Sequence, residues 1–264
     1  LKDICIREKH RKLKSDIFIA SDGPRVEAEC PTIFLGARGV KSIDLSVKLR
    51  KGGHHSGNWG GLLANPGIIL AHALSSITDA KGSIQIPEWR PPLPMSIKKA
   101  LSKIELKSAN EGPTIDNLWG EPGLTPSERV FGWNSFEILA FITGNPDEPV
   151  NAIPPEAHAN CQLRYVVGTN EKDILPALRR HLDKFGFSMV SIEDSERGDL
   201  GASRLDPNDP WVKWCKTSIH KTTKKSISLL PNLGGSLPND IFSVGMGLRT
   251  IWIPHSYAAC SQHA

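Results

Sequence analysis

The sequence lacks any apolar stretch close to the ~20 residues that cross a bilayer, which argues against a membrane protein. Its best apolar run, residues 68–71, is followed at once by His72. No apolar signal segment stands at the N-terminus, and the first residue is Leu1 rather than Met, so we expect the natural start to lie upstream. Internal repeats and low-complexity tracts are also missing.

Disulfide chemistry and nucleic-acid binding find little support either. The five cysteines are an odd number without a Cys-x-x-Cys pair, which favours reduced thiols and a cytoplasmic location. A net charge of +4 is small for 264 residues, so no nucleic-acid partner is expected. The densest basic run, residues 7–14, is interpreted as a solvated helix face. What is present, 39% hydrophobic and 23% charged residues, is typical of a globular protein with one large or two ordinary domains.

The apolar pattern divides the chain into an α/β part and an inserted α+β part. Residues 1–14 predict a short helix with a charged face, and residues 16–21 predict a buried strand. Residues 203–264 predict a helix at 207–223, opened by Asp206-Pro207, and strands at 227–230 and 250–253. Residues 39–202 run strand, helix, strand, strand, helix, strand, which is the order of a ferredoxin-like sheet. We therefore predict one α/β domain in two pieces, 1–38 and 203–264, with a middle domain inserted between them.

Within the middle domain, the strands are predicted at 42–49, 136–143, 158–167 and 187–192. The first of them alternates apolar and polar residues, which predicts a half-exposed strand. Asn65 caps a helix whose first residue is Pro66, and Asp173 caps a second helix that Gly186 ends. The buried stripe of the first helix is predicted to consist of Leu70, Ala73, Leu74 and Ile77. The residues Gly36-Ala37-Arg38-Gly39 predict a flexible crossing point. Proline-rich residues 80–134 predict an insertion on the surface of the middle domain, with a short helix at 97–104 and the anchors Trp89, Trp119 and Trp133.

Two residues near opposite ends of the chain are candidate metal ligands. Asp22 follows a predicted strand, and ligands collect outside the carboxyl ends of strands in open α/β sheets, although Asp-Gly-Pro is also an ordinary turn. His263 offers an imidazole to a metal, and a surface histidine is the alternative. The spacing from Cys260 to His263 also occurs in zinc fingers, but a structural zinc site needs a second such pair, and Cys215 with His220 lies within a helix.

Other candidates carry substrate-binding chemistry. His55 lies in a glycine-rich loop, which suggests either contact with a ligand or a merely flexible loop. Arg164 interrupts an apolar strand, so it pairs with a carboxylate, binds an anionic substrate or faces solvent. Asn151 fits an ordinary turn. The amides of Gly234-Gly235-Ser236 suit either an anion or a structural turn.

The order of these motifs resembles the co-catalytic zinc peptidase family of aminoacylase, succinyl-diaminopimelate desuccinylase, carnosinase and glutamate carboxypeptidase. The resemblance covers nearly the whole chain and rests on several blocks in the right order: Ser21-Asp22-Gly23-Pro24, Leu35 to Gly39, His55-Ser56-Gly57 with Gly60-Gly61, Asn151 to Pro154, Gln162 to Tyr165, Gly234 to Ser236, and Ser261 to His263. It implies a two-zinc α/β catalytic domain with an inserted ferredoxin-like lid domain that mediates dimerisation.

The resemblance also implies residue roles. Asp22 would bind one zinc ion and His263 the other, with other divalent metals as alternatives. His55 would act catalytically in the active site of a partner subunit, and Asn151, Arg164, Gly235 and Ser236 would hold the substrate. The family pattern further requires an upstream His and bridging Asp and a Glu-Glu pair, which this chain lacks.

We therefore expect the full-length parent to be a zinc-dependent, homodimeric hydrolase of dipeptides or N-acyl amino acids with a free carboxylate, and we expect residues 1–264 alone to be inactive. The rival hypothesis is a non-catalytic dimerisation or ligand-binding protein that has lost the metal centre. A serine acyl hydrolase is disfavoured because no Gly-x-Ser-x-Gly sequence occurs.

Overall fold

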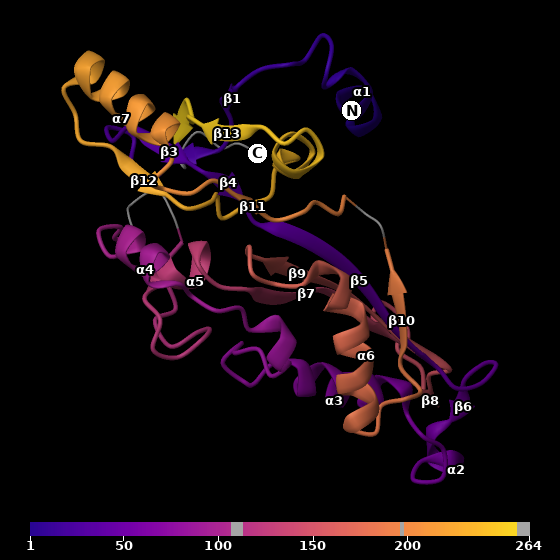
Figure 1. The fold of residues 1–264 in the computed structure, drawn as a ribbon. Helices are drawn as coiled ribbons and strands as arrows, with labels where there is room; N and C mark the ends of the chain where they lie inside the picture. The colour runs from indigo at the N-terminus through magenta and orange to yellow at the C-terminus, as the bar shows by residue number, and fades with distance from the viewer. Residues whose placement is uncertain (107–112, 196–197, 258–264) are drawn as a thin grey trace.

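The computed structural model describes residues 1–106, 113–195 and 198–257. Two sheets form its framework (Figure 1). The mixed sheet has the order β1-β13-β3-β12 and joins residues from both ends of the chain: β1 (Ile17–Ala20), β3 (Thr32–Phe34), β12 (Ser228–Leu230) and β13 (Arg249–Trp252). The pairs β1/β13 and β12/β3 are parallel, whereas β13 meets β3 in an antiparallel pairing. Residues remote in sequence therefore share one sheet.

Helices cover both faces of the mixed sheet. Side chains alternate along a strand, so Ile33 and Phe34 point to opposite faces. On the Ile33 side, α7 (Pro210–Thr223) contributes Val212 and Cys215 to a buried cluster. On the Phe34 side, the buried residues come from α4 (Met95–Leu101), α5 (Pro126–Phe131) and the turn after β12.

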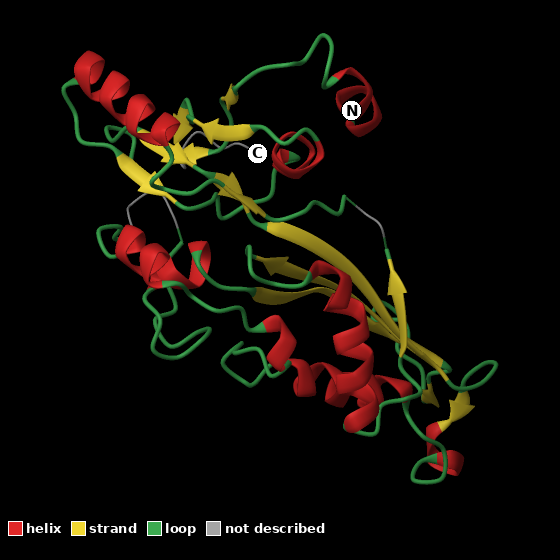
Figure 2. Cartoon of the chain, viewed as in Figure 1, coloured by secondary structure: helices red, strands yellow, loops and turns green. Residues whose placement is uncertain are grey.

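The antiparallel sheet has the order β10-β5-β9-β7, built from β5 (Gly39–Lys48), β7 (Ser135–Thr143), β9 (Glu156–Tyr165) and β10 (Ser191–Asp194). Every neighbouring pair is antiparallel. Two helices, α3 (Pro66–Ile77) and α6 (Ile174–Lys184), pack on one face of this sheet and complete its core (Figure 2). This order of strands and helices confirms the predicted fold class, an α/β framework with a ferredoxin-like α+β unit.

The remaining elements are short. They are α1 (Lys2–Glu8), β2 (Pro24–Arg25), β4 (Gly36–Ala37), β6 (His54–His55), α2 (Ser56–Trp59), η1 (Pro87–Trp89), β8 (Ala152–Ile153), η2 (Glu171–Asp173), β11 (Ser203–Arg204), the π-helix η3 (Ile241–Gly245) and β14 (Ser256–Tyr257). The short strands form three two-stranded sheets: β11 with β4, β14 with β2, and β6 with β8.

Several sequence predictions hold in detail. The Asn65 side chain accepts hydrogen bonds from the amides of Gly67 and Ile68, so it caps α3 as expected. The predicted buried stripe of α3 is also confirmed by its buried residues, which include Leu70, Ala73, Leu74 and Ile77. Gly186, with φ of +83°, follows the end of α6.

Other boundaries were wrong. Helix α1 ends at Glu8 instead of continuing to residue 14, and the strand predicted at 187–192 lies at Ser191–Asp194. Helix α7 begins at Pro210 because Asp209, and not Asp206, accepts the hydrogen bond from the Trp211 amide. The Asp173 carboxylate does not cap α6, since it is bound by the guanidinium of Arg180.

The burial of two strands also differs from expectation. Strand β1 is half-buried and partly exposed rather than buried, because it lies at an edge of the mixed sheet. Strand β5 was predicted to be half-exposed, yet Ser42 and Ser46 on its polar face are buried, because β9 and β10 flank it on both sides.

Residues 80–134 are not simply a surface insertion on the middle domain. Trp89 is fully buried in the core of the antiparallel sheet, where its indole Nε1 donates to the Ile174 carbonyl. Helices α4 and α5 instead pack on the mixed sheet. Trp119 is 54% exposed and so does not act as a core anchor. This segment therefore contacts both sheets.

The crossing between the sheets at residues 36–39 is tightly packed rather than flexible. A Cβ at Gly36 would lie 2.0 Å from the Ser203 carbonyl oxygen, and one at Gly39 would lie 2.3 Å from the Tyr165 ring. These two glycines are therefore needed for close backbone approach, not for mobility.

Within the described residues, no helix combines the length and apolarity needed to cross a membrane.

The environment of His181 predicts that the free energy of unfolding of the antiparallel sheet unit depends on pH. It is buried between α6 and α3, with Nε2 2.8 Å from the Ser76 carbonyl oxygen. Burial is the main cause that lowers the pKa of His181 below its ordinary value of 6.5. At pH values between this lowered pKa and about 6.5, His181 is protonated in the unfolded chain but not in the folded chain. The contribution of His181 to stability is therefore fully present above about pH 6.5 and decreases as the pH falls through this range.

We therefore expect the difference in unfolding free energy between wild type and His181→Gln to shrink as pH falls from about 7.5 to about 5, by roughly 1 kcal/mol per unit of pKa shift. Urea unfolding at a series of pH values measures it. Leu178→Ala, in the same helix and without a titrating group, is the control whose difference should stay constant. An equally constant difference for His181→Gln would contradict the prediction.

Candidate functional site

Four of the predicted site residues line one cavity of about 540 Å³, here called the site cavity. Asp22 comes from the turn after β1, Arg164 from the last part of β9, and Gly235 and Ser236 from the turn after β12. The site cavity thus lies where the antiparallel sheet meets the mixed sheet. Only the folded chain brings together these residues, which are more than 200 positions apart at the extremes.

Asp22 occupies an exposed turn in the wall of the site cavity. Its Oδ1 accepts a hydrogen bond of 2.6 Å from the Gly23 amide, and Gly23 has a φ of +80°. The neighbouring Ser21 hydroxyl lies 2.8 Å from Nδ1 of His255, in the loop between β13 and β14. The other carboxylate oxygen of Asp22, Oδ2, takes no part in the hydrogen bond to the Gly23 amide.

Arg164 reaches the site cavity from the polar face of the antiparallel sheet. The residues directly before and after it in β9, Leu163 and Tyr165, are buried on the helix-covered face. The Arg164 side chain points the other way, and its Nη1 donates to Oγ of Ser236 at 2.8 Å. Partial burial lowers the pKa of Arg164. Of the alternatives left open by the sequence, full exposure to solvent is therefore wrong.

The turn of residues 233–236, here called the glycine-serine turn, is fixed by the crossing segment. The Leu233 amide donates to the Gly36 carbonyl at 2.8 Å, and the Arg38 amide donates to the Leu233 carbonyl at 3.3 Å. The Arg38 Nε adds a bond of 2.6 Å to the Gly234 carbonyl. A neutral backbone turn with a fixed shape can present its remaining amides to an anion.

His55 and Asn151 form a separate group at the far end of the antiparallel sheet unit. They lie in or beside the small pair β6/β8, which Figure 1 places away from the mixed sheet. The Ser56 amide donates to the Asn151 carbonyl at 2.9 Å, and the Gly57 amide donates to the His55 Nδ1 at 3.1 Å. Within one chain, therefore, neither residue joins the site cavity.

The predicted ligand His263 lies outside the described residues, as do its neighbours Cys260, Ser261 and Gln262. Among residues 1–106, 113–195 and 198–257, no group of three or more His, Cys, Asp or Glu side chains could hold a metal ion. Asp22 is a chemically suitable oxygen ligand, but a zinc site needs several converging donors. The described residues therefore do not fit a complete two-metal centre.

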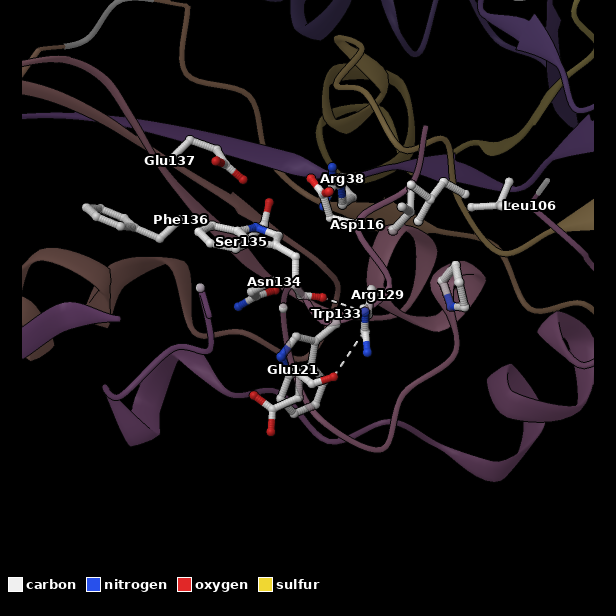
Figure 3. A pocket seen from close by; sticks show the side chains of 16 residues that line it. Arg38, Leu106, Asp116, Glu121, Arg129, Trp133, Asn134, Ser135, Phe136 and Glu137 are labelled. Carbon is white, nitrogen blue, oxygen red and sulfur yellow. Dashed lines mark hydrogen bonds between the residues drawn. The ribbon is translucent and has the colours of Figure 1, made fainter. Parts of the chain in front are cut away.

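A second cavity of about 390 Å³, here called the neighbouring cavity, shares Leu106 with the wall of the site cavity and is shown in Figure 3. Its wall includes Arg38 and residues of the 80–134 segment and of β7, among them Arg129, Trp133 and Glu137. In Figure 3 the Glu137 carboxylate points toward Arg38.

Sequence reasoning did not select Arg38 or His255 as site residues. The signal for Arg38 was present in Gly36-Ala37-Arg38-Gly39, where a charge stands between two glycines. His255 gave no such signal, because its contact with Ser21 joins residues 234 positions apart.

Comparison with known proteins finds relatives along the chain. Residues 35–189 match the family model of the peptidase dimerisation domain, M20_dimer. The human Beta-Ala-His dipeptidase is 33% identical over 236 residues, which are 86% of this chain and 45% of that protein. The chain thus spans less than half the length of this relative.

Two solved structures share the fold at low sequence identity. The crystal structure of human carnosine dipeptidase 1 matches with a TM-score of 0.79 and 20% identity, over 100% of this chain and 58% of that chain. An M20 family metallo-carboxypeptidase from Sulfolobus solfataricus matches with a TM-score of 0.77 and 21% identity, over 95% of this chain and 58% of that chain. At these identities, the similarity establishes the fold alone.

The turn that carries Asp22 can be tested through Gly23. Alanine at a positive φ costs about 1–2 kcal/mol of stability, and this cost applies equally to Gly52, whose φ is +66°. A Cβ at Gly23 would also approach Leu233 to 3.0 Å, whereas at Gly52 it would meet nothing within 4 Å. We expect Gly23→Ala to lose about 1 kcal/mol more than Gly52→Ala in chemical unfolding. Equal losses would mean that the Asp22 turn does not pack on the glycine-serine turn.

Proposed function

The chain belongs to the M20 peptidase dimerisation domain family, and on this premise we propose that the full-length protein hydrolyses the peptide or amide bond of a dipeptide or an N-acyl amino acid with a free carboxylate. The observation that carries the proposal is the convergence of Asp22, Arg164, Gly235 and Ser236 on one cavity. A volume of about 540 Å³ lies within the range of small-molecule sites. The name of the human relative, Beta-Ala-His dipeptidase, points to the same substrate class.

The site cavity carries groups suited to a substrate carboxylate. Arg164 uses one N–H group on Ser236, which leaves other guanidinium donors for a planar, bidentate contact with an anion. Because the Ser236 oxygen accepts from Arg164, its own hydroxyl hydrogen is able to donate. Partial burial of Arg164 strengthens such contacts, since charges interact more strongly where water is reduced. A free carboxylate is therefore the substrate feature that these residues recognise best.

We assign Asp22 and His263 as ligands of two different zinc ions, with another divalent metal as the alternative. The described residues supply only the first of these ligands, so we also propose that residues 1–264 on their own show negligible hydrolysis. The four cysteines within the described residues, Cys5, Cys30, Cys161 and Cys215, are free thiols, which favours a cytoplasmic location for the protein.

A homodimer would complete the site. Strand β7 is an edge of the antiparallel sheet and has a bulge between Ile138 and Ala140. Its apolar side chains Ile138, Leu139, Phe141 and Ile142 are exposed. An exposed apolar edge of this kind favours pairing with a second copy. In a two-fold dimer, each protomer would place His55 and Asn151 in the site cavity of its partner, and the separation of the two groups within one chain supports this arrangement.

The second candidate is a non-catalytic dimerisation or ligand-binding protein. It is favoured by the match of residues 35–189 to a dimerisation domain. It predicts that the full-length protein binds a carboxylate ligand and dimerises but hydrolyses no dipeptide or N-acyl amino acid.

Substitution of the proposed metal ligands separates the two candidates. In the full-length protein, we expect Asp22→Asn and His263→Ala each to lower kcat/KM for a dipeptide at least about 100-fold and to lower the bound zinc, since loss of even an outer partner of a metal ligand costs about 10–100-fold. Asp16→Asn, an exposed carboxylate before the same strand, is the matched control. Unchanged zinc content and unchanged hydrolysis in both variants would sink the assignment.

Mixing two inactive variants tests the shared site. If His55 serves the partner subunit, His55→Ala and Arg164→Met damage different sites of a mixed dimer and leave one intact site. An equimolar mixture, after exchange of subunits, should regain about a quarter of wild-type activity. Size-exclusion chromatography with light scattering verifies the dimer. A mixture as inactive as its components would show that both residues act within one chain.

A further inference from the structure

Arg38 stands at the crossing between the two sheets, directly after β4 and before β5. It lines the neighbouring cavity, where Figure 3 shows its side chain, and it is not in the wall of the site cavity. Its Nε nevertheless bonds to Gly234, which does line the site cavity. The hydrogen bond to Gly234 therefore links Arg38 to the site cavity, although the Arg38 side chain is not part of the cavity wall.

The contact between Arg38 and this turn involves both main chain and side chain. The Arg38 amide donates to the Leu233 carbonyl at 3.3 Å, and its Nε donates to the Gly234 carbonyl at 2.6 Å. The Leu233 amide donates back to the Gly36 carbonyl at 2.8 Å. Two successive carbonyls of the turn are thus held from the same side, which fixes the plane of the Gly234–Gly235 peptide.

Arg38 keeps its positive charge at neutral pH although burial disfavours the charged form. Burial lowers the pKa of Arg38 to about 10, the charge of Arg164 acts in the same direction, and the charge of Glu137 opposes it. A value near 10 leaves the guanidinium protonated at neutral pH. Among the described residues, the Arg38 guanidinium makes no ion pair within 4.0 Å. Its Nε instead donates a short hydrogen bond to the Gly234 carbonyl. A hydrogen bond from a charged donor is roughly twice as strong as a neutral one.

The geometry of the peptide unit carries this effect to the other side of the turn. The described chain contains no cis peptide bond, so the Gly234 carbonyl and the Gly235 amide point in opposite directions. With the carbonyl directed at Arg38, the Gly235 N–H points away from Arg38. Gly235 lines the site cavity, and among the described residues its N–H has no backbone acceptor. A cation on the carbonyl polarises the peptide and makes this N–H a stronger donor.

We propose that Arg38 is a positioning residue: it holds and polarises the Gly234–Gly235 peptide so that the Gly235 amide donates to a ligand carboxylate beside Arg164 and Ser236. This role rests on the proposed function of the site cavity in binding a free carboxylate. It differs from a purely structural role, because it predicts a loss that depends on the charge of the ligand. Loss of packing alone would weaken acidic and neutral ligands alike.

The test measures binding, independently of hydrolysis. Isothermal titration calorimetry of the full-length protein with N-acetylglycine and with the neutral N-acetylglycinamide gives the ratio of their dissociation constants. We expect wild type to prefer the acid, Arg38→Met to weaken binding of the acid about tenfold with little change for the amide, and Arg38→Lys to recover part of the preference, since it restores a charged donor.

Arg129→Met is the matched control. Arg129 lines the same neighbouring cavity, but it donates to the carbonyls of Glu121 and Asn117 rather than to the glycine-serine turn. We expect this variant to leave the ratio of dissociation constants unchanged. An equal loss for acid and amide in Arg38→Met, or the same change of ratio in Arg129→Met, would overturn the proposal.

A second measurement needs no variant at all. In wild-type protein labelled with 15N-glycine, N-acetylglycine should shift the Gly235 amide resonance downfield, and N-acetylglycinamide should not. The absence of this selective shift, or of any preference for the acid in wild type, would also overturn the role of Arg38. A protein that shows the preference and the shift but hydrolyses no dipeptide would support this inference while refuting the proposed hydrolysis.

Discussion

The hydrogen bonds between the crossing segment at residues 36–38 and the turn at residues 233–234 join the two sheets at the point where the site cavity forms. They depend on close backbone packing, because side chains at Gly36 and Gly39 would collide with Ser203 and Tyr165. Since Arg164 reaches Ser236 across this junction, a shift between the sheets would break the contact between them. The geometry of the site cavity therefore follows from this junction.

The placement of His55 and Asn151 has a consequence for how such a site can work. Both belong to the small pair β6/β8 at the far end of the antiparallel sheet unit, whereas Asp22, Arg164 and Ser236 meet at the junction. Under the proposed function, a single chain would bind a carboxylate at the junction without the histidine. In the proposed dimer, hydrolysis would require two copies in register, so the exposed edge β7 would matter for catalysis as well as for assembly.

The two sheets differ in how far the sequence predicts them. Apolar and polar residues alternate along residues 39–48 and 156–165, and helices precede or follow these strands in the sequence. Because this pattern is local and repeated, it was enough to predict the ferredoxin-like order of strands and helices. Strand β3 at Thr32–Phe34 was not predicted, and β1 was assigned the wrong burial, because the mixed sheet is assembled from short strands whose neighbours lie up to about 200 residues away. The helices α4 and α5 were assigned to the wrong unit for the same reason: their apolar faces are visible in the sequence, but the surface that covers them is not.

Arg164 illustrates the division between sequence and tertiary structure. The order of the motifs by itself indicated the family, whereas the sequence around Arg164 predicted a polar interruption of an apolar strand and left three environments open for its side chain. Only the folded chain decided that its partner is the Ser236 hydroxyl, that Arg38 holds the Gly234 carbonyl, and that Asn151 does not share their cavity. The reason is physical: local periodicity fixes the direction of a side chain, whereas the packing of one sheet against another fixes what that side chain meets.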